Sequence, residues 1–300
     1  MTNPSTLIKF LTYIEDRYPA NHSLLTIWGH GRGVYPDGQI PLSQTKGVIE
    51  DYTTGYGSDK TMSISDFSNA INFYKRKYNK CIDIIHFDSC SMQMIEICCQ
   101  LKDCTDFIIG AETQIPGAGS DYEMIAGHLV YTSSIAPNSL CLQLSNHFIN
   151  PKSESNSSFA FSAIRTDKID SFLLNFDYFC KCLQEKMDMQ NPSLYDIRDQ
   201  LTQIDNSYSE YIDLHEFIKI VTTTFNIPND QITQSLTNMM ISSSRSKDFN
   251  NDIWGLGINF PQSKSEFKYY QCSYSNSILD FYLLTDWNLL LEDYYNKFLD

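Results

Sequence analysis

The sequence has little positive charge and no long apolar run. It carries 22 basic side chains against 36 acidic ones in 300 residues, which gives a formal net charge of -14. A chain this acidic is a poor partner for nucleic acid or an anionic membrane surface, and it attracts cationic substrates instead. No segment approaches the roughly 20 consecutive apolar residues that cross a membrane, so we expect no membrane span. No signal peptide is recognisable, and the compartment stays open.

Several motifs of common site classes are also missing. The nine cysteines include no C-x-x-C pair, and their odd number argues against a complete disulfide framework, so we expect reduced thiols and no zinc site. The G-x-S-x-G elbow of serine hydrolases and the G-x-x-x-x-G-K-[ST] phosphate loop do not occur. The glycines around His30 fail the dinucleotide-binding spacing, because Val34 stands where the third glycine is required.

Strands and helices alternate through the first half of the chain. The 42% hydrophobic content is enough for a large core, and the apolar patterns predict strands at 23–28, 81–87 and 106–112 with helices at 63–78 and 91–101. Such alternation is typical of an α/β fold whose sheet is mostly parallel and flanked by helices. In such sheets the reactive groups gather at the carboxyl ends of the strands.

The second half of the sequence has a different texture. From Ile169 onward the apolar residues follow helical spacing. We therefore predict an α/β core over 1–168 and a helical C-terminal subdomain over 169–300, with one strand near 253–260 returning to the core.

His30 and Cys90 follow two predicted strands that one crossover joins. Neighbouring parallel strands lie about 5 Å apart, so the imidazole and the thiol are expected to meet at one edge of the sheet. Cys90 also precedes the helix predicted at 91–101, whose dipole would favour the thiolate. The backbone N–H groups of Gly31 and Cys90 are candidates for an oxyanion hole. The alternative for Cys90 is packing, which is the commoner role of a cysteine after a strand.

The order of these motifs resembles that of a known family. W-G-H-G follows the first strand, F-D-S-C follows the second, and the strand I-I-G-x-E leads into P-G-x-G-x-x-Y. In this order they resemble the clostripain-like cysteine peptidases, relatives of the caspases, gingipains and separase. The later segments FSAIRTDKID, YIDLHEFIK, GLGINFP and TDWNLLLEDY extend the resemblance over nearly the whole chain. It implies a caspase-like fold.

The resemblance also implies a mechanism. His30 would polarise the scissile carbonyl or handle protons, and Cys90 would attack that carbonyl to form a thioester. Asp88 would lie at the floor of the S1 pocket and pair with a substrate Arg or Lys, because a carboxylate in a partly dry pocket selects a cation. The alternative for Asp88 is to cap the turn before the next helix. No cofactor is implied; some relatives depend on calcium, but no D-x-D-x-D-G loop occurs here and we assign no metal site.

The glycine-rich loop departs from the family pattern. Ala118 stands where relatives often have a second pocket aspartate, and an alanine cannot bind a cation. Asp121 lies near enough in sequence to replace that acid. Gly117 and Glu112 are candidates for the same substrate loop, although a structural hydrogen bond suits Glu112 equally well. We therefore expect a preference for basic P1 residues, but the absence of the second aspartate from this loop weakens that expectation.

Two further expectations concern processing and activity. Family members are often zymogens cut at a basic residue after the histidine strand; the candidates are Arg32, Lys46 and Lys60, of which we prefer Lys46. The expected partners are peptide or protein substrates with basic residues. In the family a strand-bearing segment precedes the helix that opens this chain, so the alternative function is a silent or N-terminally truncated member that binds peptides.

Overall fold

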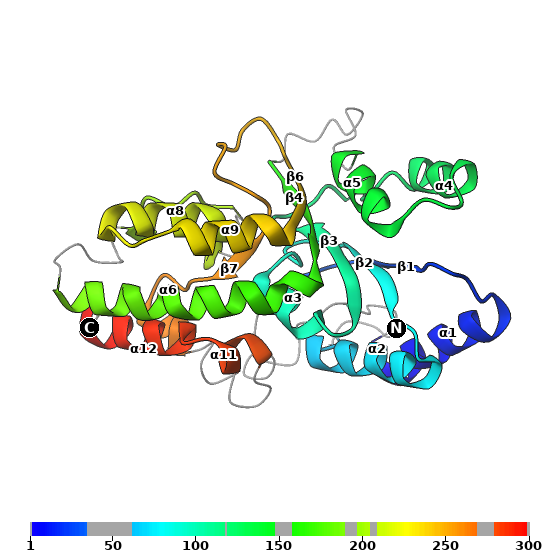
Figure 1. Ribbon diagram of the computed structural model, residues 1–300, viewed down its shortest axis with the longest axis horizontal. Helices are drawn as coiled ribbons and strands as arrows, with labels where there is room; N and C mark the ends of the chain where they lie inside the picture. The colour runs from blue at the N-terminus through cyan, green and yellow to red at the C-terminus, as the bar shows by residue number, and fades with distance from the viewer. Residues whose placement is uncertain are drawn as a thin grey trace.

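The predicted alternation of strands and helices is present in the computed structural model. The model describes residues 2–34, 62–117, 119–147, 158–189, 197–204, 209–268 and 279–298. Its first half contains α1 (Pro4–Arg17), β1 (Leu24–Trp28), α2 (Ile64–Tyr78), β2 (Ile82–Asp88), α3 (Ile95–Leu101) and β3 (Thr105–Ala111). After it come α4 (Tyr122–Tyr131), α5 (Pro137–His147), β4 (Ala160–Arg165) and the short 3-10 helix η1 (Thr166–Lys168). Figure 1 shows the sheet at the centre of this half, with helices above and below it.

The main sheet has five strands in the order β1-β2-β3-β4-β6, where β6 spans Met240–Arg245. The first three strands are parallel, β4 is antiparallel to β3, and β6 is antiparallel to β4. Four of the five strands therefore run in one direction, which confirms the mostly parallel α/β fold. The sequence patterns did not predict β4 or β6. Strand β6 reads MISSSR and is only half-buried along its length, so it lacks the apolar alternation that marks a strand.

Each face of this sheet is covered by its own hydrophobic cluster. Ile85 and Phe87 point into a cluster with α1, α2, α3 and the C-terminal helices. Ile84 and Ile109 point the other way, into a cluster that α5 completes with Leu140. Neighbouring residues of β2 thus alternate between two buried faces, as a strand in the middle of a layered α/β fold requires.

The C-terminal part is mainly helical. It contains α6 (Ile169–Met189), β5 (Tyr211–Asp213), α8 (Leu214–Phe225), α9 (Asp230–Met239), β7 (Gly257–Asn259), α11 (Asp280–Leu284) and α12 (Trp287–Phe298). The Trp287 ring packs against those of Phe176 and Phe217 in its centre, with centroid separations of 5.7 and 5.4 Å. None of the helices that the structure describes is long and apolar enough to cross a membrane.

The strand predicted near 253–260 exists, but its partner differs from the prediction. It is β7, which pairs with β5 in a separate two-stranded sheet instead of joining the five strands of the core. An isolated parallel bridge between Met94 and Gly257 links it to the core. The strand that does return from the C-terminal half to the main sheet is β6.

Candidate active site

The segment that carries His30 lies directly against the segment that carries Cys90. Strands β1 and β2 are in register with Trp28 opposite Asp88, and the Gly29 N–H extends the ladder to the Asp88 carbonyl oxygen over 3.3 Å. On the other side of His30, a Cβ added to Gly31 would collide with the Cys90 carbonyl oxygen. Both neighbours of His30 therefore touch the segment 88–90. His30 is exposed and Cys90 is half-buried, so both are within reach of a substrate.

Cys90 lies in a turn after β2 and its sulfur accepts a backbone hydrogen bond. The Ile115 N–H points at the Cys90 Sγ over 3.4 Å. Ser91, the next residue, has a φ of +55°, which is uncommon for a side-chain-bearing residue. A donor aimed at sulfur favours the thiolate over the thiol.

The expected helix N-terminus at Cys90 is wrong, because α3 begins only at Ile95. The segment between them is a turn followed by non-helical chain: the Ser91 N–H bonds to the Thr113 carbonyl and the Gln93 N–H to that of Ala111, each over 2.9 Å. These partners, at the end of β3 and just after it, prevent the helical bonds that the apolar spacing favoured. A helix dipole falls off within its first turn, so it does not activate Cys90.

Only a glycine fits at position 31. Besides the Cys90 carbonyl, an added Cβ would lie 2.7 Å from the Met92 Cγ and 2.9 Å from the Ser89 Cβ. The main chains after β1 and β2 thus approach each other more closely than any side chain would permit. This approach brings the backbone of Gly31 beside that of Cys90, where an oxyanion hole made of their N–H groups would have to form.

Asp88 is covered by the glycine-rich loop. Its side chain is 1% exposed, and its carboxylate accepts the Ser120 N–H over 3.1 and 3.2 Å and the Tyr122 O–H over 2.5 Å. Gly119 has a φ of +63°, and a Cβ there would lie 2.5 Å from the Asp88 Oδ2. The sequence did not single out Ser120 or Tyr122; the only signal was the tyrosine that ends the P-G-x-G-x-x-Y motif.

The other residues of the predicted substrate loop have separate roles. Asp121 caps α4, since its Oδ1 accepts the Met124 N–H over 3.0 Å, and this occupies the side chain that was expected to replace the missing loop acid. Gly117 is exposed, with nothing near the position of a Cβ. Ala118 lies outside the described residues.

Glu112 is fully buried and has a structural environment. Burial, and after it the nearby Asp213 carboxylate, raises the pKa of Glu112 well above its usual range. Asp213 accepts N–H groups from Glu216, Trp254 and Gly255, so the negative charge of the pair belongs on Asp213 and the proton on Glu112. Glu112 is therefore not a substrate contact; the structural alternative describes it.

His86 anchors the loop that covers Asp88. Its Nε2 lies 3.2 Å from the Ser120 Oγ and its Nδ1 lies 3.4 Å from the Thr26 Oγ1. Burial lowers the pKa of His86 to about 4, so the ring is neutral at neutral pH. Cys104 lies on the opposite face of the sheet, where its sulfur is 3.4 Å from the Ser68 Oγ, so it does not pair with His86.

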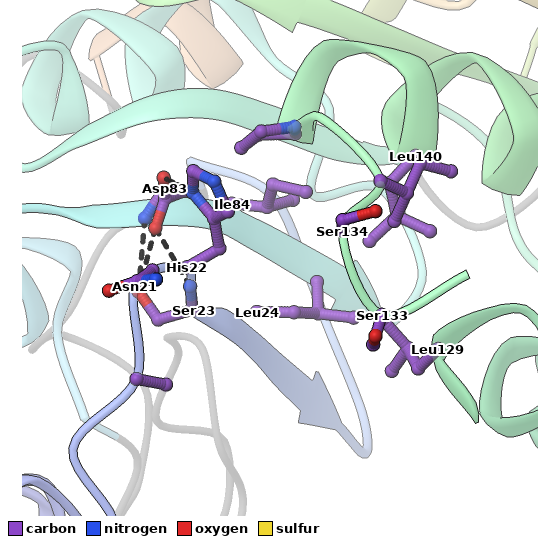
Figure 2. Close-up of a pocket in the computed structure, with 13 residues that line it drawn as sticks. Asn21, His22, Ser23, Leu24, Asp83, Ile84, Leu129, Ser133, Ser134 and Leu140 are labelled. Carbon is purple, nitrogen blue, oxygen red and sulfur yellow. Dashed lines mark hydrogen bonds and ion pairs between the residues drawn. The ribbon is translucent and has the colours of Figure 1, made fainter. Parts of the chain in front are cut away.

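A separate cavity of about 370 Å³ opens at the amino ends of β1 and β2. Figure 2 shows that Asp83 and His22 face each other across one side of it, with Leu129 and Leu140 on the other. His30, Cys90 and Asp88 do not line this cavity. Within the described part of the chain, no group of three or more His, Cys, Asp or Glu side chains is placed to hold a metal ion.

Comparison with known proteins points to one family. The model of the clostripain family, Peptidase_C11, matches residues 1–294. A comparison with curated proteins found no match.

The solved structures that resemble the chain carry titles of the same kind. One is a secreted C11 cysteine protease from Bacteroides thetaiotaomicron in complex with an irreversible peptide inhibitor, with TM-score 0.68, 18% identity, and coverage of 95% of this chain and 78% of that chain. Another is an inactive zymogen C11 protease from Parabacteroides distasonis, with TM-score 0.64, 17% identity, and coverage of 95% and 76%. A third is a clostripain from Bacteroides thetaiotaomicron ATCC 29148 with the peptide inhibitor BTN-VLTK-AOMK, with TM-score 0.54, 16% identity, and coverage of 77% and 97%.

Proposed function

The chain belongs to the clostripain family and is a cysteine peptidase, and from this premise we propose that it is an endopeptidase whose catalytic dyad is His30 and Cys90. One observation carries this assignment. The residues on both sides of His30, Gly29 and Gly31, contact the main chain at Asp88 and Cys90 respectively. The backbone segments that carry the histidine and the half-buried thiol are therefore adjacent, which supports a dyad, because a cysteine nucleophile is activated by a neighbouring base.

The reaction divides into acylation and hydrolysis. The Cys90 thiolate attacks the scissile carbonyl carbon, the new S–C bond forms, and the C–N bond breaks as His30 supplies a proton to the leaving amine. Water then cleaves the thioester, its proton passing to His30, and the carboxylic acid product leaves. The Ile115 N–H supports the thiolate between turnovers. The N–H groups of Gly31 and Cys90 would stabilise the oxyanion of both tetrahedral intermediates.

A preference for basic P1 residues is the finer part of the proposal. It is supported by Asp88, a buried carboxylate two residues before the nucleophile, and by the net charge of -14, which attracts cations. A clostripain of similar fold was solved with the peptide inhibitor BTN-VLTK-AOMK, whose peptide part ends in lysine. Guanidinium and ammonium groups are the substrate side chains that such a carboxylate would bind.

Self-processing at a basic residue in the segment that follows His30 is part of the same proposal. Lys46 and Lys60 lie outside the described residues. Arg32 is poorly placed for cleavage, because its carbonyl oxygen accepts the Tyr211 O–H over 2.7 Å and the next residue, Gly33, packs against the same ring. Lys46 therefore stays our preferred site. One related structure is titled an inactive zymogen, which is consistent with activation by cleavage.

The test is cleavage of peptides with Arg, Lys, Asp, Asn or Ala at P1. We expect cleavage after Arg and Lys, and a loss of about 10⁴-fold or more in kcat/KM for Cys90→Ala, because the nucleophile is removed. Cys182→Ala removes another half-buried thiol, on α6, and should retain full activity. The Cys90→Ala chain should also stay in one piece when it is purified.

Each departure from this result has a defined meaning. Cleavage after a non-basic residue that still requires Cys90 would retain the dyad and overturn the role of Asp88. Equal cleavage by wild type and Cys90→Ala would overturn the dyad. Processing of Cys90→Ala at Lys46 at the wild-type rate would overturn self-processing.

A further inference from the structure

The carboxylate proposed to bind the P1 residue already has a side-chain donor. The Tyr122 Oη lies 2.5 Å from the Asp88 Oδ2, which is the shortest of the contacts around this buried acid that the structure describes. Burial of the hydroxyl, and after it the same hydrogen bond, raises the pKa of Tyr122. The phenol is thus a neutral hydrogen-bond donor to Asp88, and it occupies the position where a substrate cation would have to bind.

The two donors on Asp88 differ in their freedom to move. Ser120 is fixed, because its N–H bonds to Asp88 while its hydroxyl contacts the buried His86 ring. Tyr122 is the first residue of α4, and its side chain is 43% exposed. Its ring can therefore turn toward solvent about its side-chain torsions while the loop backbone stays in place.

We propose that Tyr122 is a specificity-determining gate over Asp88, which a basic P1 side chain must displace; this proposal rests on the proposed function of the site. A guanidinium or ammonium group replaces the phenol as donor to the Asp88 Oδ2; both bonds have an ionised acceptor, but only the cation also forms an ion pair with the carboxylate. A neutral P1 side chain cannot form an ion pair with Asp88, so Tyr122 stays hydrogen-bonded to the carboxylate. The gate therefore lowers the affinity for cations, which compete with the phenol for Asp88, and has little effect on neutral side chains, which do not bind the carboxylate.

The test compares wild type with Tyr122→Phe on paired substrates that differ only in P1 arginine or citrulline. Citrulline keeps the shape of arginine but carries no charge. The phenylalanine ring leaves a buried carboxylate oxygen without its donor, and the P1 cation then restores that bond. We expect kcat/KM for the arginine substrate to rise about tenfold, mainly through a lower KM, while that for citrulline changes less than twofold.

Tyr131→Phe is the matched control, because it makes the same change on the same helix at a ring that is 90% exposed. This substitution should leave kcat/KM unchanged for both the arginine and the citrulline substrate. If cleavage after arginine requires Cys90 but the arginine-to-citrulline ratio is the same in Tyr122→Phe and wild type, the gate is wrong and the proposed function stands. If no peptide is cleaved at all, the proposed function fails first.

A binding measurement on inactive variants tests the gate independently of catalysis. Agmatine, a small guanidinium compound, is titrated calorimetrically into Cys90→Ala and into the double variant Cys90→Ala, Tyr122→Phe. We expect the double variant to bind agmatine about tenfold more tightly. Equal affinity overturns the gate, and absence of binding to both variants overturns it together with the role of Asp88.

Discussion

Gly31 is the residue at which the two strands of the candidate site come closest together. Its missing side chain lets the main chain after His30 lie against the Cys90 carbonyl, and the space is further limited by the Met92 side chain. The φ of Gly31 is not in the left-handed region, so the requirement is for space and not for an unusual backbone conformation. A substitution here should act on catalysis through the separation of the two strands.

We predict that Gly31→Ala lowers kcat/KM by about 100-fold, because the methyl group forces His30 and Cys90 apart by a fraction of an ångström or more. Gly127→Ala, on α4, is the control, since nothing lies within 4 Å of the added Cβ. Steady-state kinetics of both variants, compared with wild type, test this prediction. Full activity of Gly31→Ala would contradict the close approach of the two main chains at the dyad.

Strand β1 is an edge strand, and Asp83 holds its beginning to β2. The Asp83 carboxylate accepts the Ser23 N–H over 2.7 Å and the Ser23 O–H over 3.1 Å, and its Oδ1 lies 2.9 Å from the His22 Nδ1 (Figure 2). The Asp83 N–H in turn bonds to the Ser23 Oγ over 3.2 Å. This arrangement sets the register of β1 at its amino end, and the carboxyl end of the same strand carries His30.

We predict that Asp83→Ala lowers the free energy of unfolding by about 1–3 kcal/mol, because partly buried donors on Ser23 lose their acceptor. The control is Asp103→Ala, whose side chain is 78% exposed and pairs only at the surface with Lys102, so its effect should stay below about 1 kcal/mol. Urea unfolding of the two variants checks this. Equal midpoints would show that Asp83 does not hold the strand.

At the scale of the whole molecule, buried carboxyl groups lie where the C-terminal part meets the core. Glu96 of α3 accepts the Asn259 N–H of β7 over 2.9 Å, and burial raises the pKa of Glu96 to about 7. Asp213 of β5 is likewise fully buried, and burial raises the pKa of Asp213 to about 7 in spite of its three N–H donors. Glu112, beside Asp213, is the third of these groups.

These groups predict a stability that falls as the pH rises. Their folded pKa values lie above the usual values near 4, so the folded protein holds protons that the unfolded chain has released. Their contribution is complete below about pH 4; that of Glu96 and Asp213 is lost between about pH 4 and pH 7, and that of Glu112 is lost in the same direction as the pH rises. Across pH 5 to 8 we expect the thermal midpoint to fall.

Glu112→Gln should flatten this dependence. The amide keeps the shape and offers Asp213 an N–H in place of the carboxyl O–H but cannot ionise, so the variant should lose less stability than wild type between pH 5 and pH 8. Thermal unfolding at 1 M NaCl is the control for general repulsion in a chain of net charge -14, because salt screens surface charges far more than buried ones. If thermal stability falls with pH equally in variant and wild type, Glu112 does not hold a proton in the folded protein.

The sequence by itself determined that His30 and Cys90 share one edge of the sheet. Apolar runs and helical spacing reveal strands and helices, and parallel strands joined by one crossover end at the same edge. The motif order was specific enough to indicate the family. These features depend on local periodicity and short spacings, which a single sequence displays directly.

Only the tertiary structure decided the surroundings of the two residues. The segment after Cys90 has helical spacing, yet it is not helical because Thr113 and Ala111 accept its N–H groups. Strand β6 has no strand pattern, yet β4 pairs with it in the sheet. The Tyr122 hydroxyl donates to Asp88 from 34 residues away. In these cases the decisive partner is distant in sequence, and local pattern records which side of an element is buried but not which groups will meet it. Asp121 differs, because it caps α4 through a local bond from the Met124 N–H.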